Sequence, residues 1–160
     1  MGRISGEYFL EGEPEKIERL RLLGAGILEE GVCKLPLIEA AYFQGKKVIS
    51  SGKTPEELVS LAAKTDPLAP EKFRVLTHLR EAGFIVRMGD GKEEFFRVYK
   101  KGIRVGEDRT EMVMRVMREG EKASLEEDAA EASKMRKELV YAFVGKKGVT
   151  FFKAYRASFE

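Results

Sequence analysis

The stretch that decides the fold is EKFRVLTHLREAGFIVRMGDGKEEFFRVYKKGIRVGEDRTEM, residues 71–112. Its first part has apolar residues at helical spacing, Phe73, Leu76 and Leu79. Gly83 is typical of a helix end, and two strand-like runs then flank a Gly-Asp-Gly turn. The stretch therefore predicts a helix over 71–82 and a hairpin of strands over 84–87 and 94–99.

The segments around this stretch predict a mixture of helices and strands. After it we expect a strand over 112–116, a helix over 124–137 and a hairpin over 139–144 and 149–155. Before it we expect strands over 4–10, 32–35 and 47–50, and helices over 14–23, 37–44 and 54–64. Two helices begin with the capping-box pattern, Thr54 with Glu57 and Ser124 with Glu127.

The segment TDPLAP, residues 65–70, is the best candidate for a linker because it has two prolines in six residues. We therefore expect two small domains, an N-terminal α/β domain over 1–68 and a C-terminal nuclease-like domain over 69–160. The expected fold class is α/β (α+β), with helices and a small sheet first and a mixed sheet flanked by helices second.

Composition excludes several classes of protein. The chain has 29 Lys and Arg against 27 Asp and Glu, so any nucleic-acid contact needs a local basic face. Cys33 is the only cysteine, which excludes an internal disulfide framework, and no metal-ligand spacing is present. No apolar run is long enough to span a bilayer, so we expect a cytoplasmic location without a membrane partner. Abundant charge without asparagine is typical of a thermophile.

Four motifs occur in an order that resembles the archaeal tRNA-splicing endonuclease (tRNA-intron endonuclease) family. They are LPLIEAAYF at 35–43, FRVLTHLREAGFIVRMG at 73–89, FRVY at 96–99 and ASKMRKELVYAFV at 132–144. The resemblance implies RNA cleavage by a tyrosine, a histidine and a lysine at intron junctions, without a cofactor or metal. The reaction leaves a 2′,3′-cyclic phosphate and a 5′-hydroxyl, and its steps require a base, an acid and a fixed cation.

The resemblance places Tyr99 at the tyrosine position and Lys137 at the lysine position. The histidine position holds Arg109, which stays protonated and cannot donate a proton to a leaving group. Further departures are Glu93 and Phe95 before the FRVY segment. Ala130 stands where an RNA-clamping arginine is expected.

These departures resemble the structural chain of family members that work as α2β2 heterotetramers. The resemblance then implies a catalytic paralogous subunit as partner and precursor tRNA, cut at bulge-helix-bulge sites, as substrate. Candidate RNA contacts are Lys134, Arg136 and Arg156, and candidate interface residues are Lys146, Lys147, Phe151 and Phe152.

Plainer interpretations remain for the same residues. Tyr99 fits a half-buried core tyrosine, and Lys137 fits a cation that complements the end of a helix. Lys146 and Lys147 fit a solvated hairpin tip, and His78 has no assigned role. Two other functions stay open at this point. One is a winged-helix nucleic-acid-binding protein, with helix 71–82 as recognition helix. The other is a catalytically competent endonuclease subunit that uses Arg109 electrostatically.

Overall fold

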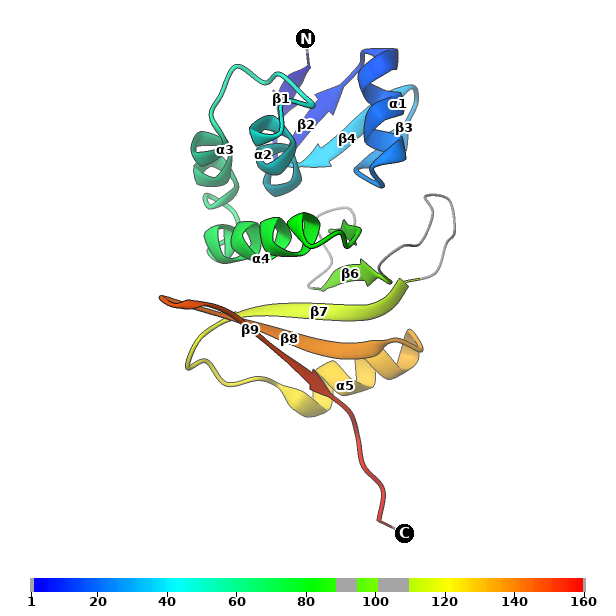
Figure 1. Cartoon of the computed structure of the whole chain (residues 1–160), viewed down its shortest axis with the longest axis vertical. Coiled ribbons are helices and arrows are strands. Elements are labelled where there is room, and N and C mark those ends of the chain that lie inside the picture. The colour runs from blue at the N-terminus through cyan, green and yellow to red at the C-terminus, as the bar shows by residue number, and fades with distance from the viewer. Residues whose placement is uncertain (1, 89–94, 101–109, 160) are drawn as a thin grey trace.

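The computed structural model describes residues 2–88, 95–100 and 110–159. Within these ranges the helices and strands form two sheets with helices around them (Figure 1). The first half, residues 2–68, holds a four-stranded antiparallel sheet in the order β1 (Arg3–Ser5), β2 (Tyr8–Glu11), β4 (Val32–Pro36) and β3 (Ile27–Glu29). The second half, residues 69–159, holds a five-stranded mixed sheet, which confirms the expected α+β fold class.

Three helices belong to the first half, α1 (Pro14–Leu22), α2 (Leu37–Gly45) and α3 (Pro55–Ala62). The sheet presents alternate residues of β2 and β4 to these helices, so that Phe9, Cys33 and Leu35 are buried. Helix α3 begins as the sequence predicts, because the Thr54 side chain accepts from the Glu57 N–H and the Glu57 carboxylate accepts from the Thr54 N–H.

Helix α4 (Ala69–Glu81) lies between the two halves (Figure 1). Its buried residues are Ala69, Val75, Leu76 and Leu79. They belong to one continuous hydrophobic cluster, the main core, which includes Phe9 and Ile38 from the first half and Val98 and Val140 from the second. Burying a Val or Leu side chain stabilises a fold by about 1.5–3 kcal/mol, so α4 joins the halves through a shared core. The boundary expected at 68/69 stays a prediction.

The second sheet has the order β5 (Val86–Arg87), β6 (Phe96–Tyr99), β7 (Thr110–Arg118), β8 (Glu138–Gly145) and β9 (Gly148–Ala154). Strands β7 and β8 are parallel, and α5 (Leu125–Lys134) makes the crossover between them. Alternation along the strands divides their side chains between two faces. One face joins the main core under α4, and the other forms a second core with α5 that contains Val113, Leu139 and Ala132.

Three expectations about local structure are wrong. Residues 4–10 form two strands instead of one, because Gly6 adopts φ 60° and turns the chain. Residues 47–50 form no strand, although Val48 and Ile49 are buried. Ser124 is the N-cap of α5 but its side chain makes no capping hydrogen bond. The expected Gly89-Asp90-Gly91 turn lies outside the described residues.

The closing hairpin is present as expected, with β8 and β9 antiparallel from Leu139 opposite Ala154 to Gly145 opposite Gly148. Helix α4 is packed on both sides and β6 is an interior strand, so neither is free to act as the recognition helix and wing of a winged-helix protein. Among the described residues, no helix is both long and apolar enough to cross a membrane.

Candidate active site

Tyr99 is the last residue of β6 and is buried. Its backbone N–H donates to the carbonyl of Ile85 at 2.9 Å. Val98 pairs with Met112 and Tyr99 pairs with Thr110, so one extra residue of β7 forms a bulge beside the tyrosine. The pairing with β7 and the bond to Ile85 fix the backbone of Tyr99 on both sides.

Lys137 is placed by the end of α5. The chain leaves this helix through Arg136, which adopts the left-handed value φ 56°. The N–H of Arg136 donates to the Ser133 carbonyl and the N–H of Lys137 donates to the Ala132 carbonyl, each at 3.0 Å. These two bonds form a Schellman motif with arginine in the position that glycine usually occupies. Lys137 then directly precedes β8 and is partly buried.

The register of the sheet brings Tyr99 and Lys137 to the same edge. Val98 lies opposite Met112, and Met112 lies opposite Glu138, so the residues next to this row share one end of the sheet. Tyr99 follows the row on β6, and Lys137 precedes it on β8, with the start of β7 between them. Two strand spacings separate their backbones by roughly 10 Å. Long side chains can cover that distance from both sides.

Arg109 and Glu93 lie outside the described residues. In sequence Arg109 immediately precedes β7, the strand between Tyr99 and Lys137. Phe95 is buried in the second core, and the guanidinium of Arg115 lies over its ring at 4.7 Å. Ala130 is exposed on α5.

His78 lies elsewhere in the fold. It is exposed on α4, and its ring contacts that of Phe151 with centroids 5.4 Å apart. Phe151 pairs with Ala142, which is five residues along the chain from Lys137. Five residues of strand span roughly 16 Å. The contact with Phe151 therefore assigns His78 to the packing of α4 on β9.

A buried network next to this edge was missed by the sequence analysis. Asp128 of α5 accepts from Arg115 Nε at 3.0 Å and from the Tyr141 hydroxyl at 2.6 Å. Burial and the hydrogen bond to Asp128 raise the pKa of Tyr141. The available signal was an acid in line with Ala132 and Met135 on the apolar side of the helix.

The other candidate residues lie on exposed surfaces. Lys134 is exposed and pairs with Glu131 at 3.4 Å, and Arg136 and Arg156 are exposed. Lys146 and Lys147 are exposed at the tip of the β8–β9 hairpin, whose Gly145 carbonyl accepts from Arg74 of α4 at 2.9 Å.

The aromatic pair on β9 divides between the two faces of the sheet. Phe151 packs against the main core, and Phe152 is 56% exposed. The Phe152 ring contacts that of Phe143 with centroids 5.7 Å apart. In the described sheet β9 is an edge strand, so Phe152 and the free edge are adjacent.

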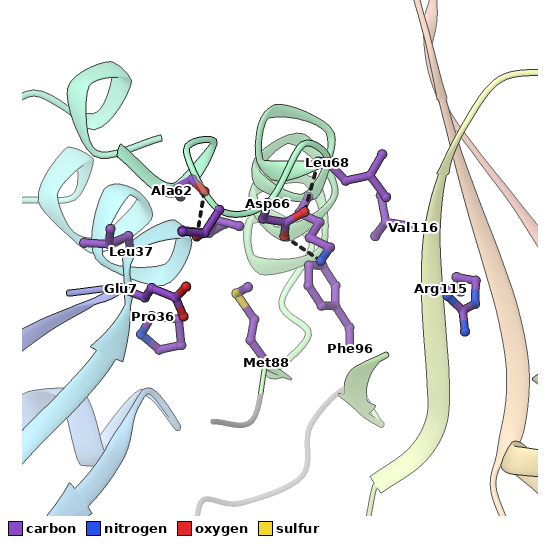
Figure 2. A pocket seen from close by; sticks show the side chains of 13 residues that line it. Glu7, Pro36, Leu37, Ala62, Asp66, Leu68, Met88, Phe96, Arg115 and Val116 are labelled. Carbon is purple, nitrogen blue, oxygen red and sulfur yellow. Dashed lines mark hydrogen bonds and ion pairs between the residues drawn. The ribbon is translucent and has the colours of Figure 1, made fainter. Parts of the chain in front are cut away.

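A cavity of about 320 Å³ lies between the halves and is a separate feature (Figure 2). Its lining includes Leu37, Met88, Phe96 and Val116, together with the ion pair of Lys72 and Asp66 at 2.6 Å. Figure 2 shows the Arg115 side chain on the far side of β7 from the other labelled residues. Neither Tyr99 nor Lys137 lines this cavity.

Comparison with known proteins identifies the family of this chain. Residues 69–151 match the family described as tRNA intron endonuclease, catalytic C-terminal domain. The chain belongs to this family. The tRNA-splicing endonuclease of Thermococcus gammatolerans is 32% identical over 137 residues, covering 80% of each chain. That of Pyrococcus furiosus is 31% identical over 163 residues, covering 92% of this chain and 94% of the relative.

Membership in the tRNA intron endonuclease family supports a function in tRNA splicing, with precursor tRNA as the substrate of the family. The relatives come from archaeal thermophiles, which agrees with the resemblance to an archaeal family and with the thermophile-like composition. In the part of the chain that the structure describes, no group of three His, Cys, Asp or Glu side chains could hold a metal ion.

Proposed function

We propose that this chain is the non-catalytic, structural subunit of a heterotetrameric α2β2 tRNA-splicing endonuclease in the cytoplasm. The proposal rests on Arg109, which the resemblance places at the position of the family's histidine. An arginine keeps its proton at physiological pH, so the leaving 5′-oxygen has no donor at that position. A histidine-bearing paralogue then supplies the acid and cuts precursor tRNA at bulge-helix-bulge sites, leaving a 2′,3′-cyclic phosphate and a 5′-hydroxyl.

The position of His78 supports this proposal. It is the only histidine of the chain, and its ring packs on Phe151 instead of facing the edge that carries Tyr99 and Lys137. In this proposal Tyr99 and Lys137 keep the residue types of the family's catalytic positions, but the chain lacks the proton donor that the reaction also needs.

The deciding experiment compares this chain alone, the paralogue alone and the two copurified, with a precursor tRNA and EDTA present. The chain alone leaves the RNA intact, and the copurified complex cuts it. In that complex Tyr99→Phe in this chain leaves the rate unchanged, whereas the same change in the paralogue lowers it by about a hundredfold or more. Cleavage by the isolated chain in EDTA would refute the non-catalytic role.

A catalytically competent subunit remains the second candidate, favoured by the retention of Tyr99 and Lys137 at one edge of the sheet. In that case Arg109 stabilises charge on the phosphorane. Arg109→Ala in this chain then slows cleavage by the complex by about a hundredfold. An unchanged rate excludes this candidate.

We further propose that β9 and its hairpin tip face the partner subunit. Phe152 exposes apolar area beside β9, an edge strand of the described sheet, and Lys146 and Lys147 add positive charge at the tip. Phe152→Asp should abolish the tetramer in native mass spectrometry. The control Leu125→Asp changes an equally exposed residue on α5, 55% exposed, and should leave the tetramer intact.

Lys134, Arg136 and Arg156 are proposed RNA contacts because all three are exposed cations. Neutralising a phosphate contact weakens binding and lowers the salt dependence of affinity. The triple alanine variant of these residues should therefore bind precursor tRNA more weakly in the assembled complex. Lys64, an exposed cation after α3, serves as the control substitution. An unchanged salt dependence would remove the three residues from the RNA surface.

A further inference from the structure

The contact between α2 and α4 contains a buried acid that is poorly compensated. Glu39 of α2 and Arg80 of α4 have side chains only 3% and 7% exposed. Glu39 Oε1 and Arg80 Nη2 are 3.8 Å apart, which is too long for a hydrogen bond. Among the residues that the structure describes, neither Glu39 Oε1 nor Arg80 Nε has a hydrogen-bond partner. The two groups therefore face each other without the bidentate contact that makes an arginine–carboxylate pair strong.

The Arg80 guanidinium donates its hydrogen bonds to backbone carbonyls. Nη1 donates to the Leu23 carbonyl, and Nη2 donates to the carbonyls of Gly24 at 3.1 Å and Val86 at 3.2 Å. The guanidinium also lies over the Phe43 ring at 5.2 Å. Leu23 and Gly24 belong to the turn after α1, whereas Val86 belongs to β5. Arg80 thus ties that turn to the second half and directs its charge mainly at backbone carbonyls.

The other groups around Glu39 do not complete its solvation. Burial raises the pKa of Glu39 to about 7, because it outweighs the attraction of Arg80 and then of Arg87 and the hydrogen bond that the Gly26 backbone donates. Cys33 and Glu11 lie on the same side, since burial and then the charges of Glu39 and Glu11 raise the pKa of the Cys33 thiol to about 11.

The surroundings of Arg80 add one further titratable group. Tyr42 of α2 interacts with the guanidinium, together with Glu39 and Arg87. Its hydroxyl bonds at 3.4 Å to Glu81, which pairs with Lys46 at 2.6 Å on the exposed rim of the contact. Glu81 and Lys46 therefore neutralise each other at the exposed rim of the contact, and neither of them pairs with Glu39.

We propose that Glu39 is protonated while the Leu23–Gly26 turn is packed on α4, and that deprotonation of Glu39 weakens this packing. The contact is then a pH-sensitive latch between the halves. The folded-state pKa lies above the ordinary value of 4.5, so the stabilisation is complete below pH 4.5 and is lost as pH rises through 7. This latch is independent of whether the chain cleaves RNA.

The direct test is a carbon-13 NMR titration of the Glu39 carboxyl in the whole protein. We expect a midpoint near 7, and a midpoint below the ordinary 4.5 would overturn the latch. The assignment comes from the Glu39→Gln spectrum, which lacks the titrating signal. Because the titration itself uses the natural chain, it does not depend on the folding of any variant.

Denaturation tests the energetic link. The midpoint in guanidinium chloride of the natural protein should fall, relative to that of Glu39→Gln, by about 0.5 M from about pH 5 to about pH 8. Glu81→Gln is the matched control on α4, because its carboxylate is exposed and its pKa is lowered by the bond to Lys46. Parallel pH curves for the natural protein and Glu39→Gln would contradict the proposal.

Hydrogen exchange locates the opening. The amides of Gly24 and Ala25 bond to Arg21 and Leu20. After correction for intrinsic rates, their exchange should speed up about tenfold from about pH 6 to about pH 8 in the natural protein. It should stay level in Glu39→Gln. Equal acceleration in both proteins would show that the opening of the turn does not depend on the protonation state of Glu39.

Discussion

Asp128 on α5 and Glu39 on α2 are buried acids in the two halves of the molecule, and their oxygens have different surroundings. Both oxygens of Asp128 accept hydrogen bonds, from Arg115 and from the Tyr141 hydroxyl. Glu39 Oε1 has no hydrogen-bond partner among the described residues, and the nearby Arg80 Nη2 is 3.8 Å away. Burial penalises both charges, and hydrogen bonds to both oxygens offset that penalty more fully at Asp128 than at Glu39. One acid anchors a helix, and the other can respond to pH.

The largest effect should come from removing the satisfied acid. Asp128→Ala leaves Arg115 and the Tyr141 hydroxyl without their acceptor, and we expect a loss of about 3 kcal/mol in the free energy of unfolding. Glu127→Ala on the exposed side of α5 is the control and should change little. Similar losses for the two variants, measured by denaturant titration, would remove the distinction between satisfied and unsatisfied acids.

The turn that contacts Glu39 provides the next test. Gly26 has φ 71°, and a Cβ there would lie 2.7 Å from Cys33 Sγ and 2.8 Å from a Leu35 methyl. Gly26→Ala should therefore cost about 2 kcal/mol, of which about half is the left-handed backbone. Gly52→Ala separates the two parts, since Gly52 has φ 77° with open space around it. Equal unfolding free energies for both variants would show that crowding contributes nothing.

Substitutions of two tyrosines compare the contribution of a buried hydrogen bond to stability with that of an exposed one. Tyr141→Phe removes a 2.6 Å bond to buried Asp128 and should cost about 1.5 kcal/mol. Tyr42→Phe removes a 3.4 Å bond to exposed Glu81 and should be nearly neutral. The difference between the two variants in thermal or chemical unfolding measures how much burial contributes. A larger loss at Tyr42 would contradict the interpretation.

The smallest expected effect concerns the starts of α3 and α5. Thr54→Ala breaks both bonds of a capping box and should cost about 1 kcal/mol. Ser124→Ala removes no capping bond and should cost only a few tenths of a kcal/mol. Unfolding midpoints of the two variants, measured in the same buffer, give the comparison. A costly Ser124 variant would mean that the hydroxyl caps α5 in solution.

The two caps also show how far sequence patterns reach. Thr54 has an extended backbone with ψ 160°, which points its hydroxyl at the N–H of Glu57. Ser124 has ψ 70°, so the same sequence pattern does not produce the same bond. A local motif therefore predicted where both helices begin but not how each one is capped.

Much of the candidate site follows from the order of the elements. The helix 71–82, the strand that ends at Tyr99 and the closing hairpin were predictable from apolar spacing and glycine turns. The parallel pairing of β7 with β8 could not be predicted in this way, because it joins strands that a helix separates in the sequence. That pairing brings Lys137 to the edge that holds Tyr99. The resemblance alone linked the two residues before the structure did.

The buried acids were hidden from sequence analysis for a different reason. Glu39 lies in the run LIEAA, where every neighbour is apolar and buried. An isolated acid in such a run signals a buried charge, but its partner Arg80 comes from another helix. Only the fold shows that the Arg80 guanidinium donates its hydrogen bonds to backbone carbonyls instead of to Glu39.

The late position of β8 in the chain has a consequence for biosynthesis. The main core includes Val140, Ala142 and Val144, which pack with residues as early as Phe9. On the ribosome, α4 and β7 therefore stay partly uncovered until residues after 137 have emerged from the exit tunnel. Nascent molecules in this interval should be the ones that chaperones capture.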